Sequence, residues 1–153
     1  GGSFCAKQFT PLYRTLSPVL ICVAIILLMK TVLLLGYVPS ASMEPTIPAE
    51  SWILGLRLRG ELETGDAVIF NRNGKLLVKR IAAVSGDTVY IDDNTHEVAV
   101  NSEPDKYTRA LAVPVGCYLL LGDNADESID ARYWAEPFVR EKDIMAALLW
   151  PEG

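Results

Sequence analysis

The sequence predicts a mainly β fold, in which an antiparallel β-sheet domain follows one N-terminal transmembrane helix. Half of the 153 residues are hydrophobic, and the excess over an ordinary soluble domain lies before residue 40. After residue 50, short apolar or alternating runs are separated by turn residues, and no helical period lasts longer than about two turns. Because the length leaves room for one modest domain and an anchor, we expect one functional site.

Residues 17–38 are predicted to form the transmembrane helix. Residues 18–38 are a nearly unbroken apolar stretch, of roughly the 20 residues that a helix needs to cross a bilayer. Gly36 followed by Pro39 marks the exit, and Lys30 lies past the midpoint, where its side chain can reach toward the interface. A cleaved signal peptide, whose apolar region is usually shorter, and a buried core helix are the alternatives.

The charges that flank this segment predict its orientation. Lys7 and Arg14 precede it, whereas the first acidic residue is Glu44. Because positive residues favour the cytoplasmic side, we expect residues 1–16 to be a cytoplasmic tail, whose first three residues are an artificial or processed end. A single-pass anchor would then hold residues 39–153 on the extracytoplasmic side of the cytoplasmic membrane.

The predicted β domain is built from short runs of aliphatic, β-branched and aromatic residues, bounded by Gly, Pro, Asn, Asp or Ser. The expected strands cover residues 51–58, 67–71, 75–85, 88–92, 97–101, 117–121 and 144–150. Asn73 and Gly74 separate two of these runs and predict a tight hairpin turn.

The composition excludes several kinds of partner and site. The chain carries 14 basic and 19 acidic side chains, and the part after residue 42 has no basic run that could neutralise a phosphate backbone, so nucleic acid is not expected. Cys5 and Cys22 lie in the tail and the apolar segment, and His96 is the only histidine. We therefore expect no disulfide scaffold, metal site, cofactor or histidine-based triad.

Ser42 is a candidate nucleophile in the segment that follows the apolar stretch. It lies between Pro39 and Pro45, where a serine is most often a turn or capping residue. Nucleophilic catalysis by serine requires a base within about 2.6–3.2 Å. With no suitable histidine, the base has to be another side chain.

Lys79 is the candidate base. Because side chains alternate in a strand, Lys79 shares one face with Leu77 and Ile81, while Arg80 lies on the other. A lysine held among apolar neighbours loses hydration, so its pKa falls and the neutral amine can accept a proton. The alternative is an edge position from which both cations reach solvent, and composition alone slightly favours it.

A third segment, residues 121–134, could complete such a site. It combines Gly122 with short polar side chains and with a carboxylate and a guanidinium, those of Asp130 and Arg132. As an ordinary loop it would place the last two in a surface ion pair. It could equally hold a hydroxyl beside a buried amine. The residues alone do not establish that the three segments meet.

Together these segments resemble the conserved motifs of bacterial type I signal peptidases, the serine/lysine family of leader peptidases. The matches are Ser-x-Ser-Met-x-Pro-Thr at 40–46, Gly-Asp-x-Val at 65–68, Lys-Arg-x-x-x-x-x-Gly-Asp at 79–87 and Gly-Asp-Asn-x-x-x-Ser-x-Asp-x-Arg at 122–132. Each motif alone is weak, but the set in this order behind an apolar segment is specific.

The resemblance implies an endopeptidase that removes N-terminal signal peptides from exported preproteins at the outer face of the cytoplasmic membrane. It implies that Ser42 is the nucleophile and Lys79 the general base, that the Ser40 hydroxyl and the Ser42 amide form the oxyanion hole, and that Ser128 orients Lys79. Charged residues that would hold the last loop in place are Asp123, Asp130 and Arg132.

The resemblance also implies how the preprotein binds: extended along a strand edge, with small residues at the first and third positions before the cut. The residues expected to border it are Tyr37, Val38, Pro39, Ile81, Ala82 and Ala83. The short stretch from 87 to 116 implies a compact form similar to Gram-positive members. Ala131 and Ala135 depart from the serine and the glycine that are common at these places.

Three other interpretations remain. A specialised relative that matures pilins would carry nearly the same motifs. A self-cleaving repressor would share the chemistry, but such proteins are cytosolic, which the apolar segment disfavours. A catalytically silent, membrane-anchored β module that binds partners would have no reason to keep both Ser42 and Lys79.

Overall fold

The computed structural model describes residues 13–102 and 104–151. The chain divides into two compact units, residues 1–32 and 33–153. In the first unit, α1 (Tyr13–Val32) is a helix whose apolar side chains between Val19 and Met29 are largely exposed. Among the residues described, no helix has both the length and the hydropathy of a membrane span.

The expected helix through residue 38 is wrong for its last six residues, which form the strand β1 (Leu33–Val38). Every residue of β1 is paired with β2 (Ser51–Leu56), from Leu33 opposite Leu56 to Val38 opposite Ser51. The cause is tertiary: a short apolar run suits a helix or a strand equally, and here pairing with β2 decides. The β domain therefore begins at Leu33 and not at residue 39.

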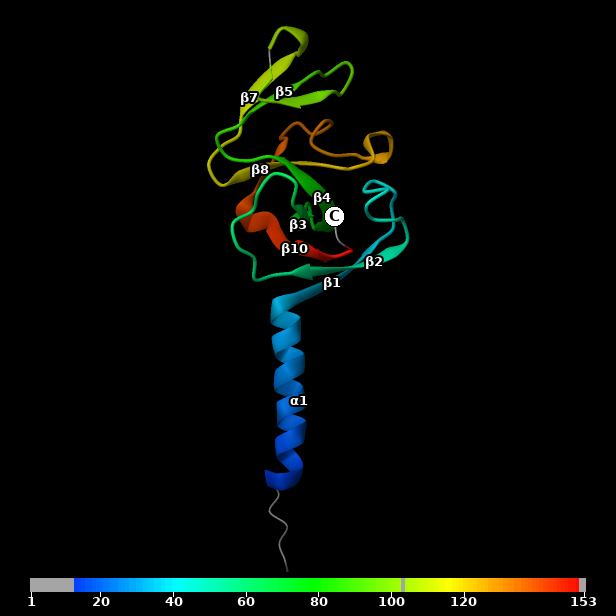
Figure 1. Cartoon of the computed structure of the whole chain (residues 1–153), viewed down its shortest axis with the longest axis vertical. Coiled ribbons are helices and arrows are strands. Elements are labelled where there is room, and N and C mark those ends of the chain that lie inside the picture. The colour runs from blue at the N-terminus through cyan, green and yellow to red at the C-terminus, as the bar shows by residue number, and fades with distance from the viewer. Residues whose placement is uncertain (1–12, 103, 152–153) are drawn as a thin grey trace, which may run out of the picture. The chain divides into compact units, whose positions relative to one another are not determined.

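The second unit contains two antiparallel sheets (Figure 1). The larger has seven strands in the order β1-β2-β10-β3-β4-β8-β9, and the smaller has the order β6-β5-β7. The remaining strands are β3 (Ala67–Arg72), β4 (Lys75–Ala83), β5 (Thr88–Ile91), β6 (Val98–Val100), β7 (Arg109–Ala112), β8 (Cys117–Leu121), β9 (Phe138–Arg140) and β10 (Ile144–Trp150). Single-turn 3-10 helices lie at Pro104–Lys106, Ala125–Glu127 and Glu141–Asp143.

The antiparallel β architecture predicted from the sequence is confirmed, and each expected strand corresponds to an observed one. The hairpin turn is confirmed as well, because Asn73 and Gly74 have φ angles of 52° and 80° and join Arg72 to its partner Lys75. Besides β1, the prediction missed β7 and β9. These strands have only four and three residues, and over so few residues an apolar pattern does not reliably identify a strand, although the equally short β5 and β6 were predicted.

One hydrophobic cluster explains why β1 and the segment after it belong to the β domain. Leu34 and Val38 of β1 pack with Met43 and Ile47, and the same cluster includes Val78 of β4. Met43 and Ile47 are completely buried. The segment that carries Ser42 is thus held in the core by the side chains on both sides of it.

A second cluster joins the small sheet to the large one. Val89 and Ile91 of β5 pack with Ala83 of β4, Leu119 of β8 and Ala131. In Figure 1 the small sheet lies on the far side of β8 from β3. The loop after β8 is therefore packed against residues of both sheets.

Candidate active site

Lys79 lies in the middle of β4, opposite Val68 of β3, and its side chain is 3% exposed. Its Nζ donates a hydrogen bond of 2.9 Å to Ser128 Oγ. Burial lowers the pKa of Lys79 below its usual value, because loss of hydration outweighs the attraction of Asp130. Of the two arrangements that the sequence left open, the buried amine is the one observed.

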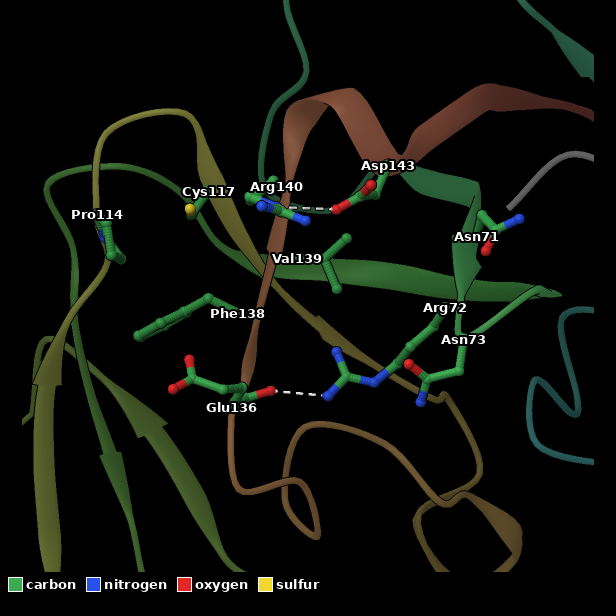
Figure 2. A pocket seen from close by; sticks show the side chains of 10 residues that line it. All are labelled: Asn71, Arg72, Asn73, Pro114, Cys117, Glu136, Phe138, Val139, Arg140 and Asp143. Carbon is green, nitrogen blue, oxygen red and sulfur yellow. Dashed lines mark hydrogen bonds and ion pairs between the residues drawn. The ribbon is translucent and has the colours of Figure 1, made fainter.

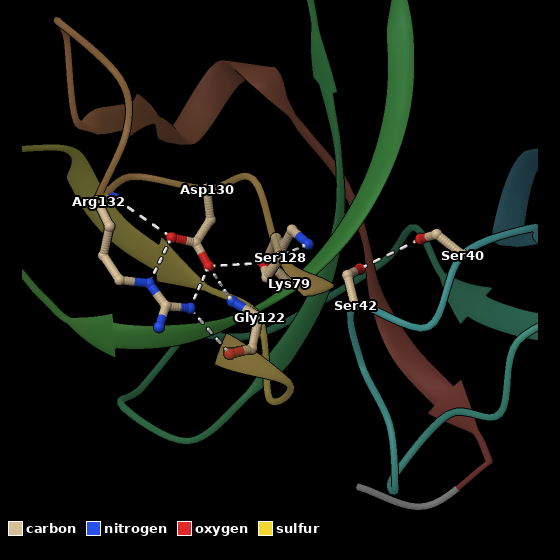
Figure 3. A network of polar contacts seen from close by, with 7 residues as sticks. All are labelled: Ser40, Ser42, Lys79, Gly122, Ser128, Asp130 and Arg132. Carbon is tan, nitrogen blue, oxygen red and sulfur yellow. Dashed lines mark hydrogen bonds and ion pairs between the residues drawn. The ribbon is translucent and has the colours of Figure 1, made fainter. Parts of the chain in front are cut away.

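The loop that follows β8, residues 122–134, is called the catalytic loop here because its Ser128 contacts Lys79, the candidate base. Its Ser128 Oγ donates a 2.6 Å hydrogen bond to Asp130 Oδ2, which also accepts one of 2.8 Å from the Gly122 amide (Figure 3). Arg132 binds the same carboxylate, with Nε 2.8 Å from Oδ1. Burial would raise the pKa of Asp130, but the hydrogen bonds from Arg132, Gly122 and Ser128 hold it below its usual value.

The same loop is tied to the other face of β4. Arg80 forms a two-pronged ion pair with Asp123, with Nε–Oδ1 and Nη2–Oδ2 distances of 2.9 and 2.7 Å. Its Nη1 also donates to the Gly65 carbonyl at 2.7 Å. The hydrogen bond to Asp123 raises the pKa of Arg80, so this cation is a permanent structural charge. Its Nη2 donates a further hydrogen bond of 3.4 Å to Thr46 Oγ1, so all four sequence motifs meet at Arg80.

The motif that carries Ser42 is also bound to the catalytic loop through its backbone carbonyls. The Asn124 amide donates to the Ser42 carbonyl at 3.0 Å, and Asn124 Nδ2 donates to the Ala41 carbonyl at 3.1 Å. At Gly122, an added Cβ would overlap Ser128 Oγ and lie 2.6 Å from the Ser42 carbonyl oxygen. The Ser42 carbonyl and the Ser128 side chain therefore both pack directly against Gly122, and no side chain fits at this position.

Ser42 is nearly buried, with 7% of the residue exposed. It accepts a hydrogen bond of 3.3 Å from the Ser40 hydroxyl, which lies at the surface. Within the described part of the chain, the side-chain hydrogen bond of Lys79 goes to Ser128, and none joins it directly to Ser42. In Figure 3 the Ser40–Ser42 pair lies to the right of the network that runs from Arg132 to Lys79, and no dashed line joins the two.

The residues expected to border a substrate differ in their surroundings. Tyr37 and Val38 belong to β1, which is at the end of the sheet and pairs only with β2. By contrast, Ile81 and Ala83 are buried, and β4 is covered on both edges there, by β8 and by the Gly65–Asp66 backbone. The segment around Ile81–Ala83 does not present the free edge expected of it.

The edge of β4 that β8 leaves open lies before Arg80, because pairing with β8 begins at Arg80 opposite Leu121. The residues concerned are those from Lys75 to Lys79. The sequence analysis missed this segment because the alternation of apolar residues continues along the whole strand and does not reveal where a neighbouring strand starts. It also missed Asn124, whose hydrogen bonds to the Ser42 segment link positions distant in the chain.

A separate cavity of about 520 Å³ lies away from these residues (Figure 2). None of its lining residues belongs to the four motifs. Its Arg72 donates to the Glu136 carbonyl at 2.9 Å and its Arg140 pairs with Asp143 at 3.1 Å, so both guanidinium groups are bonded within the protein. The cavity is therefore not part of the candidate active site.

Comparison with known proteins agrees with the motif pattern. The sequence model of the family described as "Signal peptidase, peptidase S26" matches residues 12–109 and 98–151. A probable signal peptidase I-2 of Synechocystis is 33% identical over 138 residues, covering 75% of this chain and 62% of that protein. A signal peptidase I of Bacillus licheniformis is 30% identical over 145 residues, covering 79% of this chain and 78% of that protein.

A crystal structure of a signal peptidase I from Enterococcus faecalis has a TM-score of 0.44 and 25% identity, covering 59% of this chain and 98% of that chain. The chain spans 62% of the length of the Synechocystis relative. The match of the family model over nearly the whole described part, with identities of 30% and above, confirms the resemblance of the motifs. The chain belongs to the signal peptidase family, peptidase S26.

Proposed function

We propose that the chain is a serine endopeptidase that removes N-terminal signal peptides from exported preproteins, with Ser42 as nucleophile and Lys79 as general base. The observation that carries the proposal is the buried amine of Lys79, which is desolvated and held by Ser128 next to the segment of Ser42. A binding module would have no use for a lysine whose burial opposes its own charge.

Ser128 orients the amine through the direction of its own hydrogen bond. Its hydroxyl hydrogen is directed to the Asp130 carboxylate, so its oxygen can only accept from Lys79. A neutral amine that donates one hydrogen to Ser128 keeps its lone pair for another donor. In the proposed mechanism that donor is the Ser42 hydroxyl, after a small approach of the two groups.

In the first step, Ser42 Oγ attacks the scissile carbonyl while its proton passes to Lys79 Nζ. The resulting ammonium returns the proton to the departing amine, which leaves an acyl-enzyme. A water molecule then gives a proton to Lys79 while its oxygen attacks the ester carbonyl, and Lys79 returns that proton to Ser42 Oγ as the acyl product leaves, which restores both side chains. The Ser40 hydroxyl and the Ser42 amide are proposed to stabilise the oxyanion, and the 3.3 Å contact of Ser40 with Ser42 Oγ supports this.

We propose that the signal peptide binds as an added strand between two free edges. One is β1 up to Tyr37 and Val38, and the other is the open edge of β4 that leads to Lys79. Main-chain pairing at these edges would accept many sequences, while small side chains before the cut would be selected where space is limited. Ile81, Ala82 and Ala83 are therefore not proposed to pair with the substrate, because they lie in the part of β4 that β8 covers.

We further propose that α1 inserts into the lipid of the cytoplasmic membrane and keeps the β domain on the extracytoplasmic side. The support is the run of exposed apolar side chains from Val19 to Met29, together with the absence of acidic residues from the sequence before Glu44. A membrane location would bring the enzyme to the place where exported preproteins emerge.

The test uses a preprotein with an Ala-x-Ala cleavage site and the variants Ser42→Ala and Lys79→Ala. Each is expected to abolish cleavage, which is measured by the appearance of the mature protein on a gel, while circular dichroism stays unchanged. Ser85→Ala and Lys142→Ala are matched controls, since both side chains are exposed and Lys142 lies outside the four motifs and the proposed binding edges.

Cleavage at the normal rate by Ser42→Ala or Lys79→Ala would refute the mechanism. A native chain that binds the preprotein without cutting it would instead support the interaction module.

A further inference from the structure

His96, the only histidine of the chain, contacts the catalytic loop from the small sheet. It lies in the turn between β5 and β6, and its ring packs on that of Tyr133, with centroids 4.2 Å apart and planes at 36°. Lys79 belongs to the large sheet and Tyr133 to the loop that binds it. The ring contact therefore joins the small sheet to the support of the candidate base.

The backbone of the turn determines where the His96 ring lies. Its amide donates to the Asp92 carbonyl at 2.7 Å, and the Asp92 amide donates to the Glu97 carbonyl at 3.0 Å. The φ angle of His96 is 56°, in the left-handed region that non-glycine residues seldom occupy. The ring is thus presented by a closed turn and not by a free chain segment.

Tyr133 transmits the contact to the polar network. Its amide donates to the Asp130 carbonyl at 2.9 Å, which closes a turn around Ala131 and Arg132. The carboxylate of Asp130 accepts the hydrogen bond from Ser128, which in turn accepts that of Lys79. A displacement of Tyr133 would move this turn and with it the acceptor of the lysine amine.

The His96 ring acts by packing and not through a polar contact. Its Nδ1 is buried and has no hydrogen-bond partner among the described residues. Tyr133 is 49% exposed, so its ring depends on few neighbours for its position. A phenyl ring at position 96 would preserve the contact and remove a buried polar atom without a partner.

We propose that His96 is a positioning residue for the reaction: packed on Tyr133, it holds the turn at Asp130 and thereby keeps Ser128 on the amine of Lys79. The inference rests on the proposed Ser/Lys mechanism, but it concerns a side chain outside the catalytic motifs. The inference gives the small sheet a role in orienting the amine of Lys79 and in excluding water from it.

The variants His96→Ala and His96→Phe test the proposal. His96→Ala is expected to lower kcat by about two- to tenfold, as the loss of an aromatic contact would if it were felt at the transition state, with KM unchanged. The rising limb of the pH profile is expected to move to higher pH, because a looser loop admits water to Lys79. His96→Phe is expected to retain the native kcat and pH profile.

Tyr90→Ala is the matched control. Tyr90 belongs to β5 and packs on Tyr107 at a ring distance of 5.9 Å, so its removal takes an aromatic pair from the same small sheet. It is expected to lower thermal stability without changing kcat or the pH profile. Equal losses of kcat in Tyr90→Ala and His96→Ala, or a loss in His96→Phe as large as in His96→Ala, would overturn the proposal.

A second measurement separates this inference from the proposed function. In the full chain labelled with 15N-lysine, NMR can follow the titration of Lys79 Nζ without any substrate. His96→Ala is expected to move that titration to higher pH, and His96→Phe to leave it in place. If the native chain cleaves preproteins but His96→Ala leaves the titration unchanged, the inference about His96 fails alone. If the native chain does not cleave, the proposed function fails, and the titration still decides the role of His96.

Discussion

At the scale of single residues, the reactivity of Lys79 depends on a balance between burial and charge. Asp130 is the nearest acid in its hydrogen-bond network and favours the ammonium, but its carboxylate is already paired with Arg132. The positive charge of Arg132 also acts directly against the ammonium of Lys79. Desolvation therefore prevails, and the pKa of Lys79 lies below its usual value.

The pH dependence of cleavage follows from this balance. In the proposed mechanism the neutral amine is the active form, so kcat/KM is expected to rise with pH as Lys79 loses its proton. Because burial lowers the pKa of Lys79, the midpoint of this rise is expected below the usual pKa of a lysine side chain. Initial rates on an Ala-x-Ala peptide between pH 6 and 10 would measure it. A profile that stays flat over this range would argue against an amine base.

At the scale of elements, Gly122 is the point where β8 passes into the catalytic loop and where the Ser42 segment arrives. The Gly122 amide binds Asp130, and its Cα faces both Ser128 and the Ser42 carbonyl. Such a close approach of backbone to backbone requires a residue without Cβ. The relative position of Ser42, the proposed nucleophile, and Ser128, the partner of the proposed base, thus depends on a residue without a side chain.

Gly122→Ala is expected to destabilise the protein by about 1–3 kcal/mol, the usual cost of overpacking, and to reduce cleavage by separating Ser42 from Ser128. Gly60→Ala is the matched control, since nothing lies within 4 Å of a Cβ added at Gly60. Thermal unfolding and peptide cleavage of both variants measure the difference. Equal stability and activity of the two would show that the contact at Gly122 is not restrictive.

At the scale of the whole molecule, the boundary between the two units lies at Val32/Leu33. The chain from Leu33 onward includes β1, whose Leu34 and Val38 are 5% and 6% exposed in the core cluster around Met43. β1 also provides the free sheet edge next to the segment of Ser42. The β domain should therefore keep its fold without α1, but not without β1.

Two truncated chains test this boundary. Residues 33–153 are expected to unfold cooperatively and to cleave a soluble peptide like the full chain. Residues 39–153 lose two buried side chains, at about 1.5–3 kcal/mol each, and are expected to be strongly destabilised in urea unfolding. Equal stability of the two truncated chains would place the boundary after β1.

The truncated chain of residues 33–153 also tests the proposal that α1 inserts into lipid. They are expected to remain in the supernatant when vesicles are sedimented, while the full chain is expected to sediment with the vesicles. Sedimentation of both to the same extent would show that α1 is not the attachment.

The sequence by itself determined the elements that depend on local pattern. Alternating apolar residues and turn residues predicted the strands from β2 to β10 except two very short ones, and Asn73-Gly74 predicted the hairpin. The motifs and their order predicted the family, because catalytic groups of a given chemistry need particular residue types at particular spacings. Because the one histidine of the chain, His96, lies in a polar stretch outside the motifs, a lysine was left as the candidate for the base.

Only the tertiary structure decided whether Leu33–Val38 continue a helix or form a strand, and whether Lys79 is buried or exposed. The tertiary structure also places Asn124 in contact with Ser42 and places Gly122 between Ser42 and Ser128. It shows as well which part of β4 has a free edge. The physical reason is common to all of these. Each depends on pairing or packing between segments far apart in the chain, and a local pattern carries no information on which distant segment will cover it.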